Sequence, residues 1–430
     1  MKREIIFIGS GIGALTAAAL LSKKHSVLVL EKNPVSGGYA VNFRRKNFIF
    51  DASLHALNSL NPSGILKELF EQIGIDSQIK TIGFPYLFRT VFPGLDFRIK
   101  EESDFIKVLK SFSPSEQTKI DKFFEETTKF YKGILDFEKN GKFTPLYLKS
   151  VNTTCDQFAD QFQLSTQLKT LIFQQSLYYF GLPPSQLPLF YFVYPFFDYL
   201  LNGGYYLQGG SQALTDQLVK TIINNGSHII NNAQVKRILT DNACARGIVL
   251  EDGRTFSGKI IVSGIDLKRT FSELVETDSE NFKENIFSIK PSISAFQVYL
   301  GLNKELAPNL KDDYEIFISK KLNIEDDYRN TLENNFSKCA IAATIYSNFD
   351  NSCAPAGKTN IVITTFSQYA YWSRIKTRSQ YAQEKNTVAD ALIKSLDEAI
   401  PNIRENIEVK ESASPLTMER YTGNSQGAIY

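Results

Sequence analysis

Short apolar runs at the start of the chain flank a stretch with helical spacing. Residues 4–9 form an apolar run that ends at a glycine, which predicts a buried parallel strand. Residues 11–24 place apolar side chains three and four positions apart, and residues 26–30 form a second apolar run that ends at Glu31. We therefore expect a strand–helix–strand unit at the N-terminus.

The rest of the chain predicts a mixed region of helices and strands. Residues 61–141 and 155–182 have a largely helical pattern, and two short strands are expected within 86–99. Residues 211–225 predict an amphipathic helix, followed by short strands as far as residue 262. The later expected elements are strands near 292–302, 339–348 and 359–367 and a helix at 380–399.

Composition and charge narrow the classes of function. A length of 430 residues suggests two or three domains. The 48 basic and 46 acidic residues nearly balance, which argues against a nucleic-acid partner. Four scattered cysteines and three isolated histidines make no metal motif, so we expect no metal and reduced thiols in a cytoplasmic protein. Neither a secretory signal nor a membrane-spanning apolar run is visible.

Aromatic residues are concentrated between Leu177 and Tyr206. This segment holds twelve Phe and Tyr residues, and its prolines are expected to interrupt any helix. Those prolines are Pro183, Pro184, Pro188 and Pro195. Two interpretations stay open: a wall for a long apolar ligand that touches a membrane surface, or ordinary packing in a core hairpin.

The most specific motif follows the first expected strand. The glycines Gly9, Gly11 and Gly13 and then Ala14 fit the pattern G-x-G-x-x-G/A. Gly9 permits a tight turn, Gly11 lets the backbone approach a pyrophosphate, and Ala14 allows close packing of helix on strand. Phosphates are expected over the helix N-terminus, where N–H groups and the helix dipole favour negative charge.

Glu31 and two further glycines refine the expected cofactor. Glu31 lies at the end of the second strand, about 20 residues after the glycine motif, where a carboxylate accepts hydrogen bonds from ribose hydroxyls. It would repel a 2′-phosphate, which favours FAD or NAD over NADP. The adjacent Gly37 and Gly38 resemble an element of flavoproteins of the glutathione-reductase type, and this resemblance favours FAD.

The block from Glu31 to Leu57 resembles the FAD-dependent phytoene desaturase family, in particular its carotenoid isomerase and retinol saturase branch. The resemblance extends from residue 2 to residue 430. Further matching segments are 206–211, 235–238, 263–266, 354–357 and 414–423.

The resemblance implies a role for each matching residue. It assigns the pyrophosphate to Gly9, Gly11, Gly13 and Ala14, and the adenosine ribose to Glu31. It places Gly37 and Gly38 beside the ribityl chain and the backbone of Val235 against the adenine. It also places Asp51 and His55 near the isoalloxazine.

The sequence departs from the family at several positions. Ala14, Gly264 and Ile265 are mild substitutions. Family members continue past the residues that match Tyr430 into a glycine-rich stretch that closes over the flavin. The resemblance therefore predicts either a fragment of a longer member or a C-terminally truncated member whose FAD site lacks this segment.

Three further groups have alternative roles. His55 is a candidate catalytic residue, as a proton donor or an orienting group beside flavin and substrate, or a structural histidine between domains. Asp51 is expected to cap a turn or a helix start. The basic residues 44–46 are expected in a solvated turn between strands, although phosphate or lipid headgroups are an alternative.

We therefore expect an α/β fold with a discontinuous, glutathione-reductase-type, Rossmann-like FAD domain and a second α+β domain. The FAD domain is predicted at residues 1–60 and 205–275, and the substrate domain at 61–204 and 276–430. The expected activity is FAD-dependent oxidoreduction of a lipophilic carotenoid, retinoid or fatty acyl chain, drawn from a membrane surface. A flavin amine oxidase and a non-catalytic lipid-binding protein, like the Rab GDP-dissociation inhibitors, remain alternatives.

Overall fold

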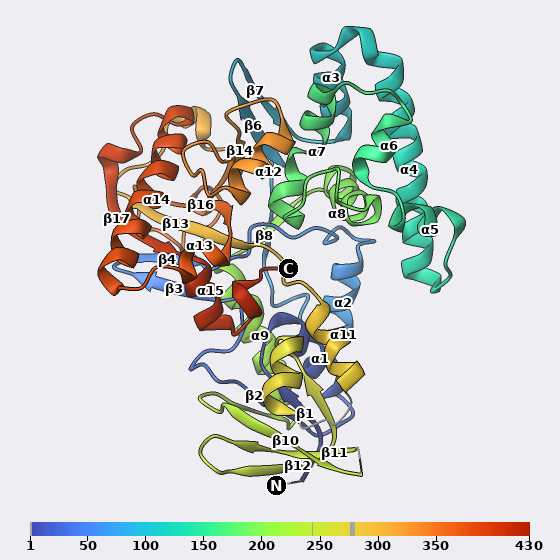
Figure 1. Cartoon of the computed structure of the whole chain (residues 1–430), viewed down its shortest axis with the longest axis vertical. Helices are drawn as coiled ribbons and strands as arrows, with labels where there is room; N and C mark the ends of the chain where they lie inside the picture. The colour runs from blue at the N-terminus through green and yellow to red at the C-terminus, as the bar shows by residue number, and fades with distance from the viewer. Residues whose placement is uncertain (1, 243, 276–279) are drawn as a thin grey trace.

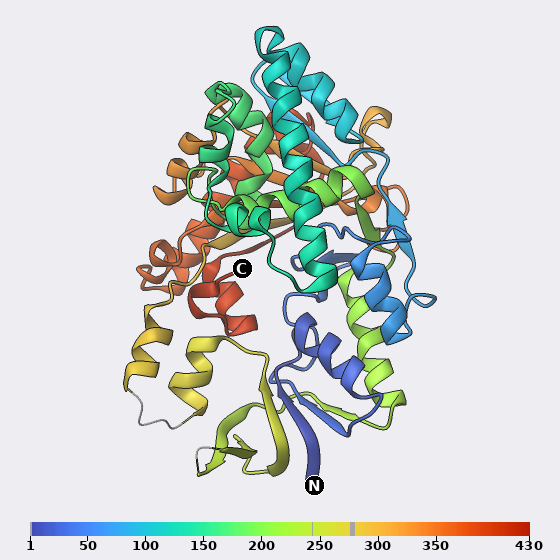
Figure 2. The same cartoon turned by 90° about the vertical axis from the view of Figure 1, so that its right-hand side faces the viewer.

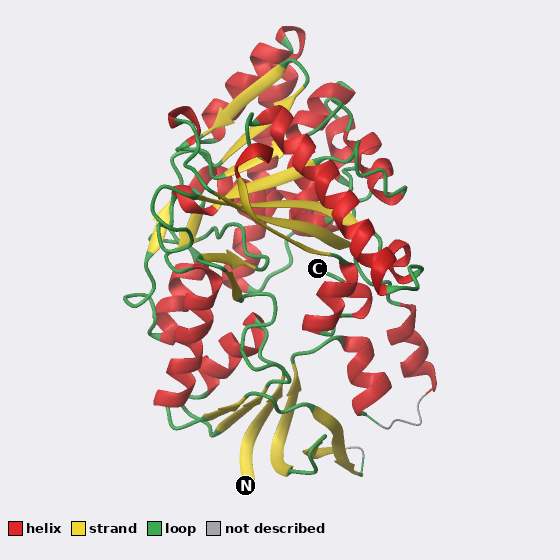
Figure 3. Ribbon diagram, turned by 90° about the vertical axis from the view of Figure 1, so that its left-hand side faces the viewer, coloured by secondary structure: helices red, strands yellow, loops and turns green. Residues whose placement is uncertain are grey.

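Two large sheets dominate the fold, one below the other along the longest axis (Figures 1 and 3). The computed structural model describes residues 2–242, 244–275 and 280–430. Helices surround both sheets, and the C-terminus lies near the centre of the molecule in two perpendicular views (Figures 1 and 2).

The first sheet has six strands in the order β10-β11-β12-β1-β2-β9. Strands β12, β1, β2 and β9 run parallel to one another. Strand β11 runs antiparallel to both of its neighbours, β12 and β10. The expected N-terminal unit is confirmed as β1 (Lys2–Ile8), α1 (Ile12–Leu21) and β2 (Val27–Leu30). The other strands are β9 (His228–Ile230), β10 (Val235–Asp241), β11 (Cys244–Leu250) and β12 (Thr255–Ser263).

Helices cover one face of this sheet because both surfaces are apolar. Helix α9 (Gly210–Asn224) packs against α1, and α2 (Ile65–Ile73) joins the same core through Phe70 and Ile73. The helix α2 lies within the range expected for the substrate domain, yet it packs on the first sheet. The division of the chain into two domains therefore remains a prediction.

The second sheet has seven strands in the order β17-β13-β16-β15-β14-β6-β7. Only β14 and β6 are parallel neighbours. Its strands are β6 (Phe88–Phe92), β7 (Leu95–Ile99), β13 (Ser294–Leu302), β14 (Glu315–Ile318), β15 (Ile341–Ile345), β16 (Thr359–Ser367) and β17 (Ile407–Ala413). One face packs on α14 (Arg378–Ala399) through side chains such as Phe296 and Ile363.

The opposite face of the second sheet meets two groups of elements. A hairpin of β3 (Asn42–Arg45) and β4 (Phe48–Asp51) covers one part, and α7 (Thr166–Phe180) and α8 (Leu189–Asn202) cover another. Of the basic residues 44–46, which are all exposed, Arg44 and Arg45 end strand β3 and only Lys46 lies in the turn, so the expected turn is met in part. The other helices are α3 (Glu102–Phe112), α4 (Gln117–Asn140), α5 (Pro145–Val151), α6 (Cys155–Asp160), α10 (Leu267–Arg269), α11 (Glu280–Ser288), α12 (Ile324–Leu332), α13 (Tyr369–Ser373) and α15 (Pro415–Thr422). Two short strands, β5 (Thr81–Gly83) and β8 (Tyr205–Leu207), pair with each other.

The aromatic segment forms two helices instead of a hairpin. Prolines 183, 184 and 188 lie between α7 and α8, as expected, but Pro195 lies inside α8. The expectation that Pro195 interrupts a helix was wrong. Phe192 and Phe196, before and after Pro195, are buried in the core, and this burial stabilises the helix across the proline. Proline leaves the carbonyl four residues earlier, that of Tyr191, without its helical partner. Tyr191 is exposed, so water can satisfy that carbonyl.

Candidate functional site

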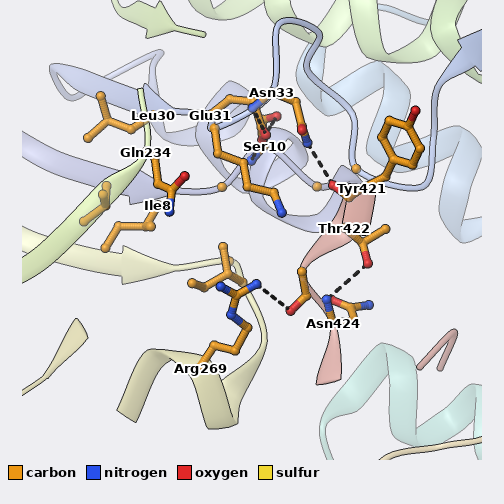
Figure 4. A pocket seen from close by; sticks show the side chains of 18 of the residues that line it. Ile8, Ser10, Leu30, Glu31, Asn33, Gln234, Arg269, Tyr421, Thr422 and Asn424 are labelled. Carbon is orange, nitrogen blue, oxygen red and sulfur yellow. Dashed lines mark hydrogen bonds between the residues drawn. The ribbon is translucent and has the colours of Figure 1, made fainter. Parts of the chain in front are cut away.

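A cavity of about 250 Å³ lies at the carboxyl ends of β1 and β2 (Figure 4). Ligands of open parallel sheets bind at this edge. Its lining combines the loop after β1, the residues after β2, the start of β10, the turn after β12, the end of α10 and the end of α15. The lining includes Gly9, Ser10, Gly11, Glu31, Lys32, Asn33, Gly37, Gly38, Gln234, Val235, Arg269, Tyr421, Thr422 and Asn424.

The glycine loop leaves the N-terminus of α1 open towards this cavity. Gly9 has a φ of +87°, and a Cβ there would lie 2.7 Å from Cγ2 of Ile265. A Cβ on Gly11 would meet no atom within 4 Å, and no side chain caps the helix. The free N–H groups at this helix end can therefore receive an anion.

The rest of the motif supports the packing of α1. Gly13 and Ala14 lie outside the cavity lining. Ala14 contacts the chain just after β12, where a Cβ on Gly264 would lie only 2.8 Å from the Ala14 Cβ. The small residue that the motif requires at this position thus allows the close approach of helix and strand.

The Glu31 carboxylate connects three backbone segments of the site. Its Oε2 accepts hydrogen bonds from the Ser10 backbone N–H at 2.9 Å and the Ser10 hydroxyl at 2.5 Å. Its Oε1 accepts from the Asn33 backbone N–H at 2.8 Å. Glu31 is 5% exposed and lines the cavity, so it fixes the glycine loop and places a negative charge there.

Gly37 and Gly38 bring the following loop against the glycine motif. Gly37 forms a parallel bridge with Gly11. Gly38 has a φ of +63°, and a Cβ there would lie 3.1 Å from the Gly11 Cα. Val235 begins β10 on the other side of the cavity, at a register shift in its pairing with β11. The structure therefore brings all the predicted cofactor residues except Gly13 and Ala14 around one cavity, although their roles with a cofactor remain predictions.

Several lining residues were missed from the sequence. Lys32 and Arg269 place two cations at the cavity, and burial together with the Arg269 charge lowers the pKa of Lys32. Nδ2 of Asn33 donates to the Tyr421 carbonyl at 3.0 Å, which ties the end of α15 to the site. The resemblance of segment 414–423 to the family could have pointed to this end of α15, but it assigned no role to individual residues.

Asp266 anchors the segment after α15. Its Oδ2 accepts from the Ser425 N–H and its Oδ1 from the Ser425 hydroxyl, both at 2.9 Å. Burial alone would raise the pKa of Asp266, but hydrogen bonds from Ser425 and Arg269 lower it. An ionised carboxylate therefore fixes the chain directly after the lining residues 421–424.

Asp51 connects the β3–β4 hairpin to α9. Its Oδ2 accepts from the Ser211 N–H at 2.8 Å and from the Tyr206 hydroxyl at 3.0 Å. Its Oδ1 accepts from the Leu54 N–H at 3.1 Å. Asp51 therefore caps both a turn and a helix start, which confirms the structural expectation, and burial raises its pKa to about 6.

His55 lies on a segment that crosses the second sheet. The hydroxyls of Tyr346 and Tyr314 donate to the carbonyls of Leu54 and His55, and the Tyr299 hydroxyl lies 3.1 Å from the Ala52 carbonyl. The His55 Nδ1 lies 3.1 Å from Oγ1 of Thr344. Burial lowers the pKa of His55 to about 4, so its imidazole is neutral near pH 7 and suits an orienting role.

The residues that the structure describes contain neither a metal-binding cluster nor a membrane-spanning helix. Across residues 2–242, 244–275 and 280–430, His, Cys, Asp and Glu side chains form no cluster that could hold a metal. Every helix in the described part of the chain is too short or too polar to span a bilayer.

Fold comparison finds solved structures that share the fold of nearly the whole chain. The chain aligns with a putrescine oxidase at a TM-score of 0.68 and 12% identity, over 99% of this chain and 87% of that one. An oxidoreductase from Methanosarcina mazei aligns at 0.66 and 18% identity (96% and 87%). RAB GDI from Plasmodium falciparum aligns at 0.58 and 12% identity (96% and 88%). The expected fold class is confirmed.

Sequence comparison then identifies the relatives. Residues 8–73 match the family described as NAD(P)-binding Rossmann-like domain. A prolycopene isomerase from an Oncidium hybrid is 27% identical over 99% of this chain and 74% of its own length. The Danio rerio all-trans-retinol 13,14-reductase is 23% identical (99% and 77%), and a Staphylococcus haemolyticus 4,4′-diapophytoene desaturase is 24% identical (99% and 88%). These matches confirm the resemblance to this group of enzymes.

Proposed function

We propose that this protein is an FAD-dependent oxidoreductase that desaturates, saturates or isomerises a long unsaturated lipophilic substrate. The observation that carries the proposal is the similarity over 99% of the chain to relatives named for carotenoid and retinol chemistry. The dinucleotide cavity supplies an independent argument for a cofactor of this type.

The cavity fits the adenosine and pyrophosphate part of FAD. The open helix N-terminus at Gly11 would face the pyrophosphate, and the Glu31 carboxylate would accept from ribose hydroxyls. Lys32 and Arg269 add positive charge beside two phosphates. The space beside Gly11 would be lost to any larger side chain, which is the arrangement that close approach of a phosphate requires.

The remaining predicted residues continue from the cavity towards the second sheet. Gly37 and Gly38 lead into the β3–β4 hairpin, and Asp51 fixes the end of that hairpin to α9. The tyrosine hydroxyls then hold residues 52–55 on the second sheet. A bound flavin supplies hydride transfer at N5, and the protein positions the substrate beside it.

The substrate side of the second sheet is rich in aromatic side chains. Phe317, Phe366 and Tyr178 pack together there, with ring centroids 4.9 Å apart for Tyr178 and Phe317 and 6.2 Å apart for Tyr178 and Phe366. Phe190 and Tyr194 of α8 are only partly buried. Aromatic and apolar walls of this kind suit a long unsaturated chain.

Product analysis tests the proposal. The purified chain is loaded with FAD and incubated without oxygen with prolycopene, 4,4′-diapophytoene or all-trans-retinol, each with the flavin oxidised and reduced. We expect at least one polyene to yield a product of changed unsaturation or geometry. An FAD-loaded chain that converts none of these probes, but oxidises putrescine, would favour an amine oxidase.

A non-catalytic lipid-binding protein is the second alternative, and the fold of RAB GDI supports its architecture. The open glycine loop favours the enzyme, because a lipid carrier has no need of a free helix N-terminus at a dinucleotide cavity. A chain that binds polyenes but takes up no FAD would support the carrier.

The proposed function includes peripheral contact with a membrane surface. Exposed apolar side chains gather at and before α5, namely Phe143, Leu146, Leu148 and Val151. Lys142 and Lys149 lie among them in sequence and can approach anionic headgroups. Co-sedimentation with anionic vesicles tests this contact, and we expect Phe143→Ser with Leu148→Ser to weaken it.

A further inference from the structure

A row of buried polar side chains crosses the second sheet on the face that carries residues 52–55. Gln297 of β13 is paired opposite Thr364 of β16, and Glu315 of β14 is paired opposite Thr344 of β15. Opposite residues in antiparallel strands place their Cβ atoms about 4.5–5.5 Å apart on one face. Apolar bands flank this row on the same face, with Phe317, Ala342 and Phe366 towards α7 and α8, and Tyr299 and Val362 towards the β3–β4 hairpin. Buried polar groups in such surroundings are costly and therefore suggest a use.

Glu315 is the ionisable member of this row. Its carboxylate is 1% exposed, and its Oε2 accepts a hydrogen bond from the Tyr179 hydroxyl of α7 at 2.7 Å. No salt bridge in the described part of the chain includes Glu315. Burial raises the pKa of Glu315 to about 7, so much of it holds a proton near neutral pH. The titratable side chains that feel its charge are Tyr178, Tyr179, Tyr199, Tyr314 and Tyr346.

Tyr179 donates to this buried carboxyl group and is itself only partly buried. Tyr179 and His55 are only half-buried, although burial shifts the pKa of each strongly. Tyr430 shows the same combination, with 53% exposure and a pKa raised by burial. Each of these three side chains therefore keeps part of its surface exposed, and Figures 1 and 2 show the C-terminus near the centre of the molecule.

We propose that Tyr179 and Glu315 form a proton-transfer pair, in which Tyr179 contacts the substrate and Glu315 supplies or receives the proton behind it. The inference rests on the proposed function and extends it, because net hydrogenation or dehydrogenation needs a proton as well as a hydride. Thr344 connects the pair to the proposed flavin region, since it is paired with Glu315 and contacts His55.

The step balances in the saturating direction. The π bond of one C=C group breaks, and one carbon receives a hydride from the reduced flavin. The adjacent carbon receives the Tyr179 hydroxyl proton, while the proton of the Glu315 carboxylic acid passes to the Tyr179 oxygen. Glu315 becomes a carboxylate and regains a proton from water. Desaturation reverses each transfer and reduces the flavin.

Matched variants separate this role from a structural one. Tyr179→Phe removes the proposed donor, and Glu315→Gln removes the acid while conserving its size. Tyr371→Phe is the phenol control, because the Tyr371 hydroxyl also donates to a carboxylate, that of Glu384, but lies on α13 beside the opposite face of the second sheet. Asp327→Asn is the carboxyl control, because Asp327 is also buried with a pKa of about 7 but lies on α12.

Single-turnover kinetics with the polyene that reacts in wild type measure the effect. We expect Tyr179→Phe and Glu315→Gln to retain FAD and polyene binding but to lose about 100-fold or more in rate, the usual range for a general acid or base. Glu315→Asp is expected to recover part of the rate, and both controls to stay within threefold of wild type. Infrared difference spectra between pH 6 and pH 8 should lose one protonated-carboxyl band in Glu315→Gln and show it shifted in Tyr179→Phe.

Distinct outcomes overturn the two proposals. A Tyr179→Phe or Glu315→Gln variant that reacts within threefold of wild type would exclude the proton-transfer pair alone. An equal loss in Tyr371→Phe would show that the loss does not depend on the Tyr179 hydroxyl, and it would exclude the pair. A wild-type chain that binds FAD but converts no polyene would contradict the proposed function, and the pair with it.

Discussion

At the scale of single residues, Gly11 and Glu31 contribute different properties to the proposed dinucleotide site. Gly11 provides space, because no atom lies within 4 Å of a Cβ built on it. Glu31 provides order, because its carboxylate accepts three hydrogen bonds from Ser10 and Asn33. Space for a phosphate and a fixed carboxylate for a ribose are complementary requirements of one ligand.

Gly11→Ala tests the contribution of Gly11 to FAD binding separately from its contribution to folding stability. The backbone at Gly11 has a φ of −60°, which alanine adopts freely, so we expect the thermal midpoint to stay within about 2 °C of wild type. The new methyl group occupies the space of the pyrophosphate, so FAD affinity should fall at least tenfold by fluorescence titration. Gly83→Ala, at an exposed strand position where a Cβ makes only ordinary contacts, is the control. Unchanged affinity in Gly11→Ala would place the phosphates elsewhere.

Buried carboxyl groups predict an unusual dependence of stability on pH. Burial raises the pKa of Glu315 from 4.5 and that of Asp327 from 3.8 to about 7. Between these values the folded chain binds more protons than the unfolded chain, so stability falls as pH rises through about 7. His55 acts in the opposite sense, because its pKa falls from 6.5 to about 4, but only below pH 6.5.

We therefore expect the thermal midpoint to fall as pH is raised from about 6.5 to about 8. Scanning calorimetry of wild type and Asp327→Asn in parallel buffers measures this change. The variant should show a smaller fall, because one of the two groups no longer titrates. A midpoint that rises over this range would contradict the assignment of raised pKa values.

At the scale of elements, the hairpin β3–β4 and the segment 52–55 join the two sheets. Asp51 ends the hairpin and accepts hydrogen bonds from the start of α9. Three tyrosine hydroxyls from the second sheet and its strand ends then contact the carbonyls of Ala52, Leu54 and His55. The position of His55 over Thr344 follows from these contacts rather than from the local sequence.

Asp51→Ala is expected to destabilise the protein by about 2–4 kcal/mol, because it leaves the Ser211 N–H and the Tyr206 hydroxyl without their buried acceptor. Urea unfolding followed by circular dichroism measures the change. Asp241→Ala, at an exposed strand end, is the control and should change the free energy of unfolding by less than about 0.5 kcal/mol. An equal effect of both substitutions would remove the special role of Asp51.

The N-terminal unit was predictable because its information is local. The apolar run, the glycines and Glu31 lie within the first 31 residues, and α1 and β2 follow directly from them. Strand β14 was not predicted, because it has only four residues. It forms by pairing with β6 and β15, which are far away in sequence. Glu315 and Arg269 were missed for the same reason, since neither belongs to a local motif. Pro195 was misread because burial of its helix outweighs the local cost of proline.

At the scale of the whole molecule, the dinucleotide cavity gathers distant parts of the chain. The loop after β1, the start of β10, Arg269 and the segment 421–424 contribute to one lining. Asp266 and Asn33 hold the last of these in place. A ligand in this cavity therefore contacts both ends of the chain.

FAD should protect residues 421–430 from hydrogen exchange and raise the thermal midpoint, because a ligand of the folded state stabilises it in proportion to its binding. Asp266→Ala should reduce this protection, since it releases Ser425. Exchange measured by mass spectrometry with and without FAD tests both points. Protection confined to the first sheet would show that the C-terminal segment takes no part in binding.

The most direct test of the account is an anaerobic visible spectrum of the FAD-loaded chain, recorded before and after a polyene is added. We predict that FAD binds, and that the polyene bleaches the oxidised flavin, reoxidises the reduced flavin, or is itself shifted in its absorption as its geometry changes. A chain with bound FAD whose flavin and polyene spectra both stay unchanged, in either redox state, would contradict the central claim.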